Sequence, residues 1–156
     1  MLARCFSAAV LGIDGFPVEV EVNVTGKDSA GESAVSIVGL PDAAVKESRD
    51  RVRSALESTG LGHPKGFTVV NLAPADLRKE GTGFDLAIAL GMLAASGNVD
   101  KDSLAGTALL GELALNGAIR PVKGVLPCAA VLGADPRIER ILVPEANARE
   151  AALAAG

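Results

Sequence analysis

Aromatic side chains are scarce in this sequence. Its 156 residues include no tryptophan and no tyrosine, and four phenylalanines carry all of its aromatic rings. Proteins that bind single-stranded nucleic acid by stacking need several aromatic side chains on one sheet face, so this composition argues against such binding. Hydrophobic residues still make up 49% of the chain. This composition predicts closely packed layers of helix and sheet without an aromatic cofactor pocket.

Histidine and cysteine are also scarce. His63 is the only histidine, and it lies in a segment rich in glycine and proline, where we expect an exposed loop. No second imidazole is available to share a metal ion or to serve as a triad base. Cys5 and Cys128 are isolated and form no C-x-x-C motif, a pattern typical of two reduced thiols in a cytoplasmic protein. We therefore predict no metal site and no disulfide framework.

The chain has no excess of positive charge. Its net charge is −4, which does not favour nucleic acid or an acidic membrane surface as a partner. The first apolar stretch is too short and too polar to span a membrane, so we expect no membrane association. We expect weak DNA binding or none, because contacts to phosphates dominate such affinity. The candidate residues for a weak interaction surface are Lys46, Arg49, Arg53, Arg78 and Lys79.

A phosphate-binding loop is missing as well. The motif G-x-x-x-x-G-K-[ST] does not occur, and neither of the glycine-rich segments 60–66 and 79–83 has its spacing. The second segment could form a small backbone nest for an anion, but a tight turn is the simpler interpretation. We therefore expect no ATP site and no other cofactor in these 156 residues.

The first forty residues predict an antiparallel meander. A strand with strict alternation follows an Asp14-Gly15 turn, which favours a hairpin. A second turn is expected at 26–31. The three strands of this meander are predicted at residues 2–11, 18–24 and 34–38. Later in the chain we expect strands at 67–73 and 140–143, and a hairpin at Asn116-Gly117.

Helices are predicted in four places. The first begins at 39–42 and ends near Thr59, with Pro41 at its first position and Asp42 in its first turn. Its solvated face is expected to carry i,i+4 ion pairs, Glu47 with Arg51 and Arg53 with Glu57. The other helices are expected at 83–96, at 123–132 and from 146 onward.

The helix at 83–96 differs from the others because it is apolar on nearly every side, so it should be buried. Thr82 and Asp85 precede it in the spacing of a capping box, with Thr82 as the expected N-cap. Taken together, the pattern predicts one α+β domain over residues 1–156, with helices packed on the sheet.

Three long segments stand out: VGLPDAAVKESRDRVRSALE at 38–57, NLAPADLRKEGTGFDLAIALGMLAASG at 71–97 and GELALNGAIRPVKGVLP at 111–127. Together they resemble the ComM/YifB family of magnesium-chelatase-like AAA+ ATPases. The family usually has proline before KEG and after FDL, where this chain has Arg78 and Ala87. The segments occur in order and span most of the chain, which makes the resemblance specific.

The resemblance implies a Lon-protease-like fold, also described as ribosomal-protein domain 2-like: an antiparallel meander followed by βα units. It further implies that an AAA+ module binding ATP and magnesium lies beyond residue 156. This chain would then not be an enzyme, whereas the full-length protein would be an ATPase. The implied assembly is a cytoplasmic hexamer that acts on DNA, in branch migration during natural transformation.

Lon-type peptidases use a serine nucleophile and a lysine base. By similarity of the flanking motifs, these positions are Gly83 and Leu126 here, so the resemblance implies no catalytic residue. Two alternatives stay open. One is a peptidase with a displaced dyad of Thr82 and Lys123, and the other is a chelatase subunit that supports metal insertion into a tetrapyrrole.

Overall fold

The computed structural model describes residues 1–26 and 33–155. The turn expected at 26–31 therefore lies largely outside the described residues. A six-stranded sheet has the order β3-β4-β2-β1-β5-β8, and β6 and β7 form a separate pair. The strands are β1 Leu2–Leu11, β2 Asp14–Thr25, β3 Ser33–Val38, β4 Gly66–Ala73, β5 Thr107–Leu109, β6 Glu112–Leu113, β7 Ile119–Arg120 and β8 Arg140–Leu142. The helices are α1 Ala43–Lys46, α2 Ser48–Ser58, α3 Asp85–Ala95, α4 Lys101–Ala105, α5 Val125–Gly133, the 3-10 turn η1 Glu145–Asn147 and α6 Ala148–Ala155.

The hairpin of β1 and β2 confirms the predicted pairing, but its turn is at Gly12 and Ile13, not at Asp14-Gly15 as predicted, because those two residues already pair within the sheet. The two strands pair antiparallel from Leu2 opposite Asn23 to Leu11 opposite Asp14. The buried side chains of β2 are the alternate valines Val18, Val20, Val22 and Val24. Strict alternation thus identified both the strand and its buried face.

The third strand of the predicted meander was placed wrongly. β3 pairs parallel with β4, and β4 lies between β3 and β2, to which it is antiparallel. The connection from β3 to β4 contains α1 and α2, and a helical crossover is what a parallel pair requires. The class is still α+β, as predicted.

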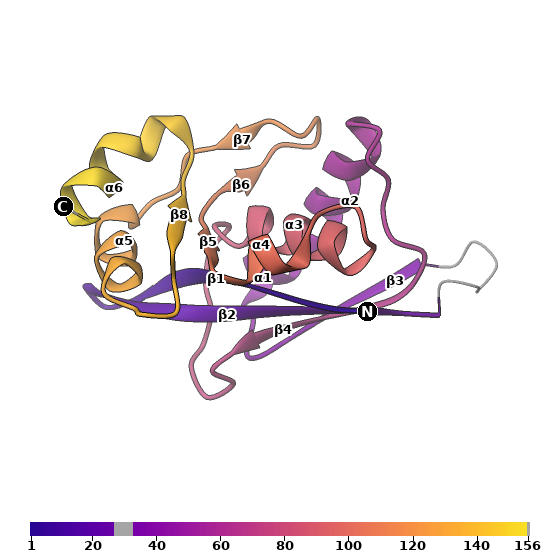
Figure 1. Cartoon of the computed structure of the whole chain (residues 1–156), viewed down its shortest axis with the longest axis horizontal. Coiled ribbons are helices and arrows are strands. Elements are labelled where there is room, and N and C mark those ends of the chain that lie inside the picture. Colours follow the sequence, from indigo (N-terminus) through magenta and orange to yellow (C-terminus); the bar gives the residue numbers. More distant parts are fainter. Residues whose placement is uncertain (27–32, 156) are drawn as a thin grey trace.

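Helices cover the sheet from both sides. Cys5 and Ala9 of β1 belong to the larger core, with α2 and α3, while Phe6 and Ala8 belong to a second core with α5. Because neighbouring side chains of a strand point to opposite faces, α3 and α5 lie on opposite faces of the sheet. Figure 1 shows α1 to α4 above the long β1–β2 ribbon, with α5 and α6 grouped at its left-hand end.

α3 is buried as predicted. Nine of its residues, including Asp85 and Gly91, are buried. A Cβ added at Gly91 would lie 2.6 Å from Cγ2 of Val22, so this glycine lets the helix lie close to β2. The predicted capping box is wrong, because α3 begins at Asp85 and no side chain caps it.

The first predicted helix is divided. α1 ends at Lys46, and α2 begins at Ser48 after a turn at Glu47. Asp42 is the N-cap of α1 and does not lie in its first turn, because its Oδ1 accepts a hydrogen bond from the Val45 amide at 2.8 Å. The hairpin at Asn116-Gly117 is confirmed as β6–β7. Within the described residues, no helix is both long and apolar enough to cross a membrane.

Candidate functional site

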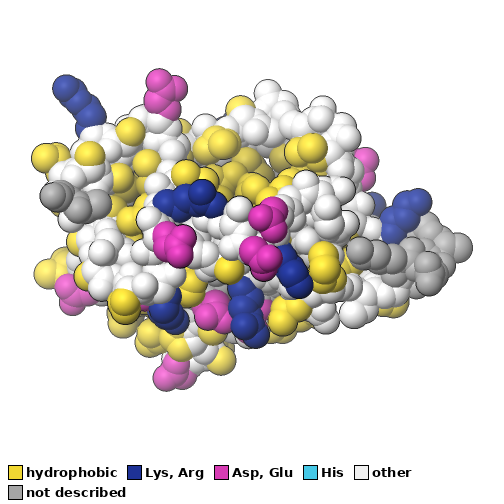
Figure 2. Space-filling model, in the orientation of Figure 1, with side chains coloured by type: hydrophobic (Ala, Val, Ile, Leu, Met, Phe, Trp, Pro, Cys, Tyr) yellow, Lys and Arg dark blue, Asp and Glu magenta, His cyan; other side chains and the backbone are white. Residues whose placement is uncertain are grey.

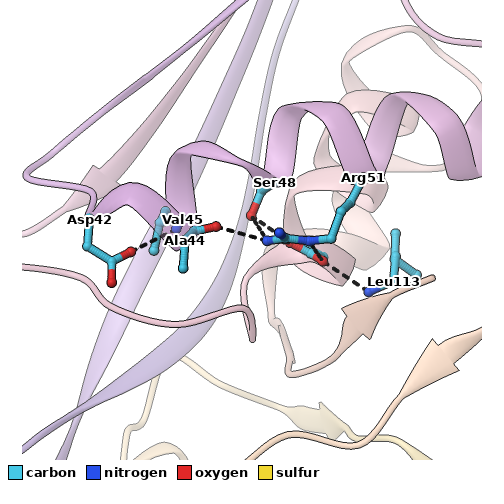
Figure 3. A network of polar contacts seen from close by, with 7 residues as sticks. Asp42, Ala44, Val45, Ser48, Arg51 and Leu113 are labelled. Atoms are coloured by element: carbon cyan, nitrogen blue, oxygen red, sulfur yellow. Dashed lines mark hydrogen bonds and ion pairs between the residues drawn. The ribbon is translucent and has the colours of Figure 1, made fainter. Parts of the chain in front are cut away.

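A buried carboxylate, that of Asp85, joins three parts of the chain. Its side chain is 0% exposed. The Ser48 hydroxyl donates to Oδ1 at 2.5 Å, and the Leu113 amide donates to Oδ2 at 3.0 Å. Arg51 donates from Nε to Oδ2 at 2.7 Å and from Nη2 to Oδ1 at 3.0 Å. Figure 3 shows Ser48 and Arg51 of α2 and the amide of Leu113 in β6 pointing toward one another.

The sequence predicted that Arg51 lies on a solvated helix face, and this prediction is wrong. The Arg51 side chain is 19% exposed and forms an ion pair with Asp85, not with Glu47. It also donates to the Ala44 carbonyl at 2.9 Å, which ties α1 to α2. Hydrogen bonding to Asp85 raises the pKa of Arg51 above its already high ordinary value, so the guanidinium stays charged. Two parallel bonds between guanidinium and carboxylate are a strong and specific pairing.

Lys79 forms a second connection between the first two family segments. The sequence placed it on a weak interaction surface, but it is 0% exposed. Its Nζ donates to the carbonyl of Gly39 at 2.7 Å and to that of Pro74. Its backbone accepts from the Asp42 amide and donates to the Leu40 carbonyl, both at 2.9 Å. Burial lowers the pKa of Lys79. A lysine can occupy this buried position because the aliphatic part of its side chain packs among its neighbours while its amine hydrogen-bonds to the two carbonyls.

The remaining basic residues of the predicted surface are exposed. Lys46, Arg49 and Arg53 lie on α1 and α2, and Arg78 lies in the loop after β4. Arg78 is 3.6 Å from Glu80, and both side chains are mostly in solvent. On the face drawn in Figure 2, acidic and basic side chains alternate among the described residues, without a continuous basic stripe. Such a surface offers weak attraction to phosphates.

A cleft of about 530 Å³ lies next to this network. β1 and β5 pair in parallel only at Phe6 and Ala108. Beyond that pair the two strands separate, and the cleft lies between the segments that follow. Clefts at the carboxyl ends of parallel strands are common binding positions. The lining residues are Ala8, Ala9, Val10, Asp42, Glu80, Gly81, Thr82, Gly83, Phe84, Leu110, Glu112, Pro121, Val122, Lys123, Val125 and Cys128.

The structure brings three of the peptidase candidates together in this cleft and leaves one out. Thr82, Gly83 and Lys123 all line it, whereas Leu126 does not and is 47% exposed. A Cβ at Gly83 would meet nothing closer than Cγ1 of Val122, at 3.7 Å, so a side chain would fit there. Within the described residues, no hydrogen bond joins the Thr82 hydroxyl to the Lys123 amine. A dyad needs such a bond to activate its nucleophile.

The other nucleophile in the lining is Cys128. Burial raises its pKa to about 11, and burial raises that of Cys5, on β1, to about 12. Both thiols are therefore protonated at neutral pH, and a protonated thiol is a poor nucleophile.

His63 lies in the loop before β4, outside the cleft lining. It is half-buried and not exposed as predicted. Burial lowers the pKa of His63, and the positive charge of Arg53 lowers it further. The described residues contain no cluster of three or more His, Cys, Asp or Glu suited to a metal ion.

Comparison with known proteins gives a consistent result. A family model described as subunit ChlI of Mg-chelatase matches residues 20–147. The competence protein ComM of Haemophilus influenzae is 43% identical over 152 residues, which are 97% of this chain and 29% of that protein. The protein YifB of Escherichia coli is 43% identical over 155 residues, 99% of this chain and 29% of that protein.

An uncharacterized protein of Mycobacterium tuberculosis is likewise 43% identical over 155 residues, covering 99% of this chain and 30% of its own length. This chain thus spans about 30% of the length of the relatives it matches. The matched region contains all three segments that Asp85 and Lys79 hold together.

We expect Asp85→Asn to destabilise the protein by about 3–5 kcal/mol, because it removes the buried carboxylate that pairs with the partly buried Arg51 and leaves that guanidinium without its counter-charge. Urea unfolding followed by circular dichroism measures this change. Glu80→Gln is the matched control, since it removes a carboxylate from an exposed pair and should cost about 0–1 kcal/mol. Equal unfolding midpoints for the two variants would show that the Asp85 network is not the main connection.

Proposed function

This chain belongs to the magnesium-chelatase-like family that includes ComM and YifB, and from that premise we propose that it is the non-catalytic N-terminal domain of an AAA+ ATPase that processes DNA. The observation that carries the proposal is the 43% identity to a competence protein over 97% of the chain. Competence concerns the uptake of DNA, and branch migration of recombining strands during natural transformation is the role we propose.

The proposal assigns ATP and magnesium to a module that follows residue 156. In support, the 156 residues contain no phosphate-binding loop. We propose that the full-length protein assembles as a hexamer and that this domain contributes a rigid platform to it. The platform would consist of the three family segments, which Asp85 joins at α2, α3 and β6.

The proposal also treats the cleft as non-catalytic. The position at which Lon-type peptidases carry serine is Gly83, which has no side chain, and Lys123 is exposed to water. A general base must lie within hydrogen-bonding reach of the nucleophile, and among the described residues no hydrogen bond joins Lys123 to Thr82. The alternative peptidase is still worth a test, because Thr82 and Lys123 line the same cleft.

A comparison between this chain and the complete reading frame that contains it tests the ATPase proposal. We expect the longer protein to hydrolyse ATP, and forked or four-way-junction DNA to stimulate the rate, while this chain alone is inactive. A parallel assay supplies a tetrapyrrole and magnesium with ATP. Metal insertion without any effect of DNA would refute the proposed DNA function and favour a chelatase subunit.

A digest of unfolded casein tests the non-catalytic assignment. We expect the casein to stay intact after prolonged incubation with this chain, because no base among the residues that the structure describes is hydrogen-bonded to the Thr82 hydroxyl. The Thr82→Ala and Lys123→Ala variants should behave like the unmodified chain. Cleavage that is lost in both variants would identify an active peptidase and contradict the assignment.

A further inference from the structure

One edge of β1 is unpaired beside the cleft, where Ala8 and Ala9 are each 6% exposed and Val10 is 37% exposed. The strand pairs along its whole length with β2, but on its other side only Phe6 pairs, with Ala108 of β5. Ala8, Ala9 and Val10 follow this pair and line the cleft. Among the described strands, none pairs with this part of the edge. A strand edge of this kind can accept the backbone of another extended segment.

The charged side chains in the cleft are mostly acidic. Asp42, Glu80 and Glu112 line it together with a single cation, Lys123. The Asp42 carboxylate accepts hydrogen bonds from the backbone amides of Val45 and Gly81, which hold it in position at the cleft wall. Glu112 has no ion pair among the described residues. Glu80 is paired with Arg78 outside the lining, so Asp42 and Glu112 against the ammonium of Lys123 leave an excess of negative charge. This excess favours a positively charged occupant and opposes a chain of phosphates.

Exposed apolar side chains lie beside one end of the cleft without lining it. Leu11, which follows the lining residue Val10, is 61% exposed, and Ile13, at the turn of the β1–β2 hairpin, is 90% exposed. Leu126, which follows the lining residue Val125 in α5, is 47% exposed. The hairpin and α5 are adjacent, since a Cβ at Gly124 would lie 2.9 Å from Cγ2 of Val10. Exposed apolar residues next to a polar cleft can contact a bound polypeptide.

We propose that this cleft binds an extended, basic polypeptide segment, which adds to the unpaired edge of β1 opposite β2. The backbone of the segment would pair with Ala8 to Val10. Because successive side chains of a strand point to opposite sides, a segment that alternates basic and apolar residues fits best. Its basic side chains would face the carboxylates, and its apolar ones would lie against Leu11, Ile13 and Leu126. This proposal does not depend on an ATPase module.

Fluorescence anisotropy with labelled probes tests the proposal. The probes are a short peptide of alternating lysine and valine, its glutamate–valine counterpart, and an oligothymidine. We expect saturable binding of the lysine peptide, about tenfold tighter than that of the glutamate peptide, and a loss of affinity with added salt. No binding of the lysine peptide, or tighter binding of the oligothymidine, would overturn the proposal.

Variants then locate the site. Gly83→Leu should fill the cleft, since the glycine faces open space and its φ is not positive, and it should weaken binding about tenfold or more. Ile13→Ser should also weaken it, because it removes an apolar contact without adding charge. Glu145→Gln, an exposed change on η1 away from the lining, is the control. Amide chemical shifts of Ala8 to Val10 should move on titration. Undiminished binding by Gly83→Leu, with these amides unmoved, would contradict the assigned position.

Discussion

The arrangement of this domain depends on how one buried negative charge is satisfied. The carboxylate of Asp85 has no access to solvent, and a buried charge is tolerated only when it is paired and hydrogen-bonded. Its partners come from α2 and from the amide of Leu113 at the end of β6. Placing Asp85 at the first position of α3 therefore fixes the distance of that helix from α2 and from the β6–β7 hairpin.

The cleft follows from the same constraint. Its wall from Glu80 to Phe84 leads directly into α3, and the opposite end of that wall is held by Lys79 and Asp42. The Gly83 carbonyl accepts from the Gly111 amide at 3.1 Å, which joins this wall to the third family segment. The segment 79–83, in which a tight turn was expected, is thus a rigid boundary between a core helix and an open groove. Its one hydroxyl, that of Thr82, makes no hydrogen bond to Lys123 among the described residues.

Local pattern predicted the elements better than their partners. The β1–β2 hairpin, the β6–β7 hairpin and the buried α3 were all evident from alternation, turn residues and an apolar run. The pairing of β3 with β4 was not, because alternation identifies a half-buried strand but not its neighbour. Arg51 and Lys79 were both assigned to the surface on charge alone. Their burial depends on acceptors distant in sequence, 34 residues away for Arg51 and 40 for the Gly39 carbonyl that Lys79 contacts. For Lys79, the single available sign was its place inside a family segment.

The central claim is that Asp85 holds the three family segments together, and hydrogen exchange at the Leu113 amide tests it most directly. This amide donates to Asp85 at 3.0 Å in a buried setting, so its exchange should be slow in the unmodified chain. In Asp85→Asn we expect faster exchange at Leu113 and also at Gly111, which bonds to the segment before α3, with little change at Val20 in the middle of the sheet. If Leu113 and Gly111 keep their protection in Asp85→Asn while the protein remains folded, the segments are held by something other than this carboxylate.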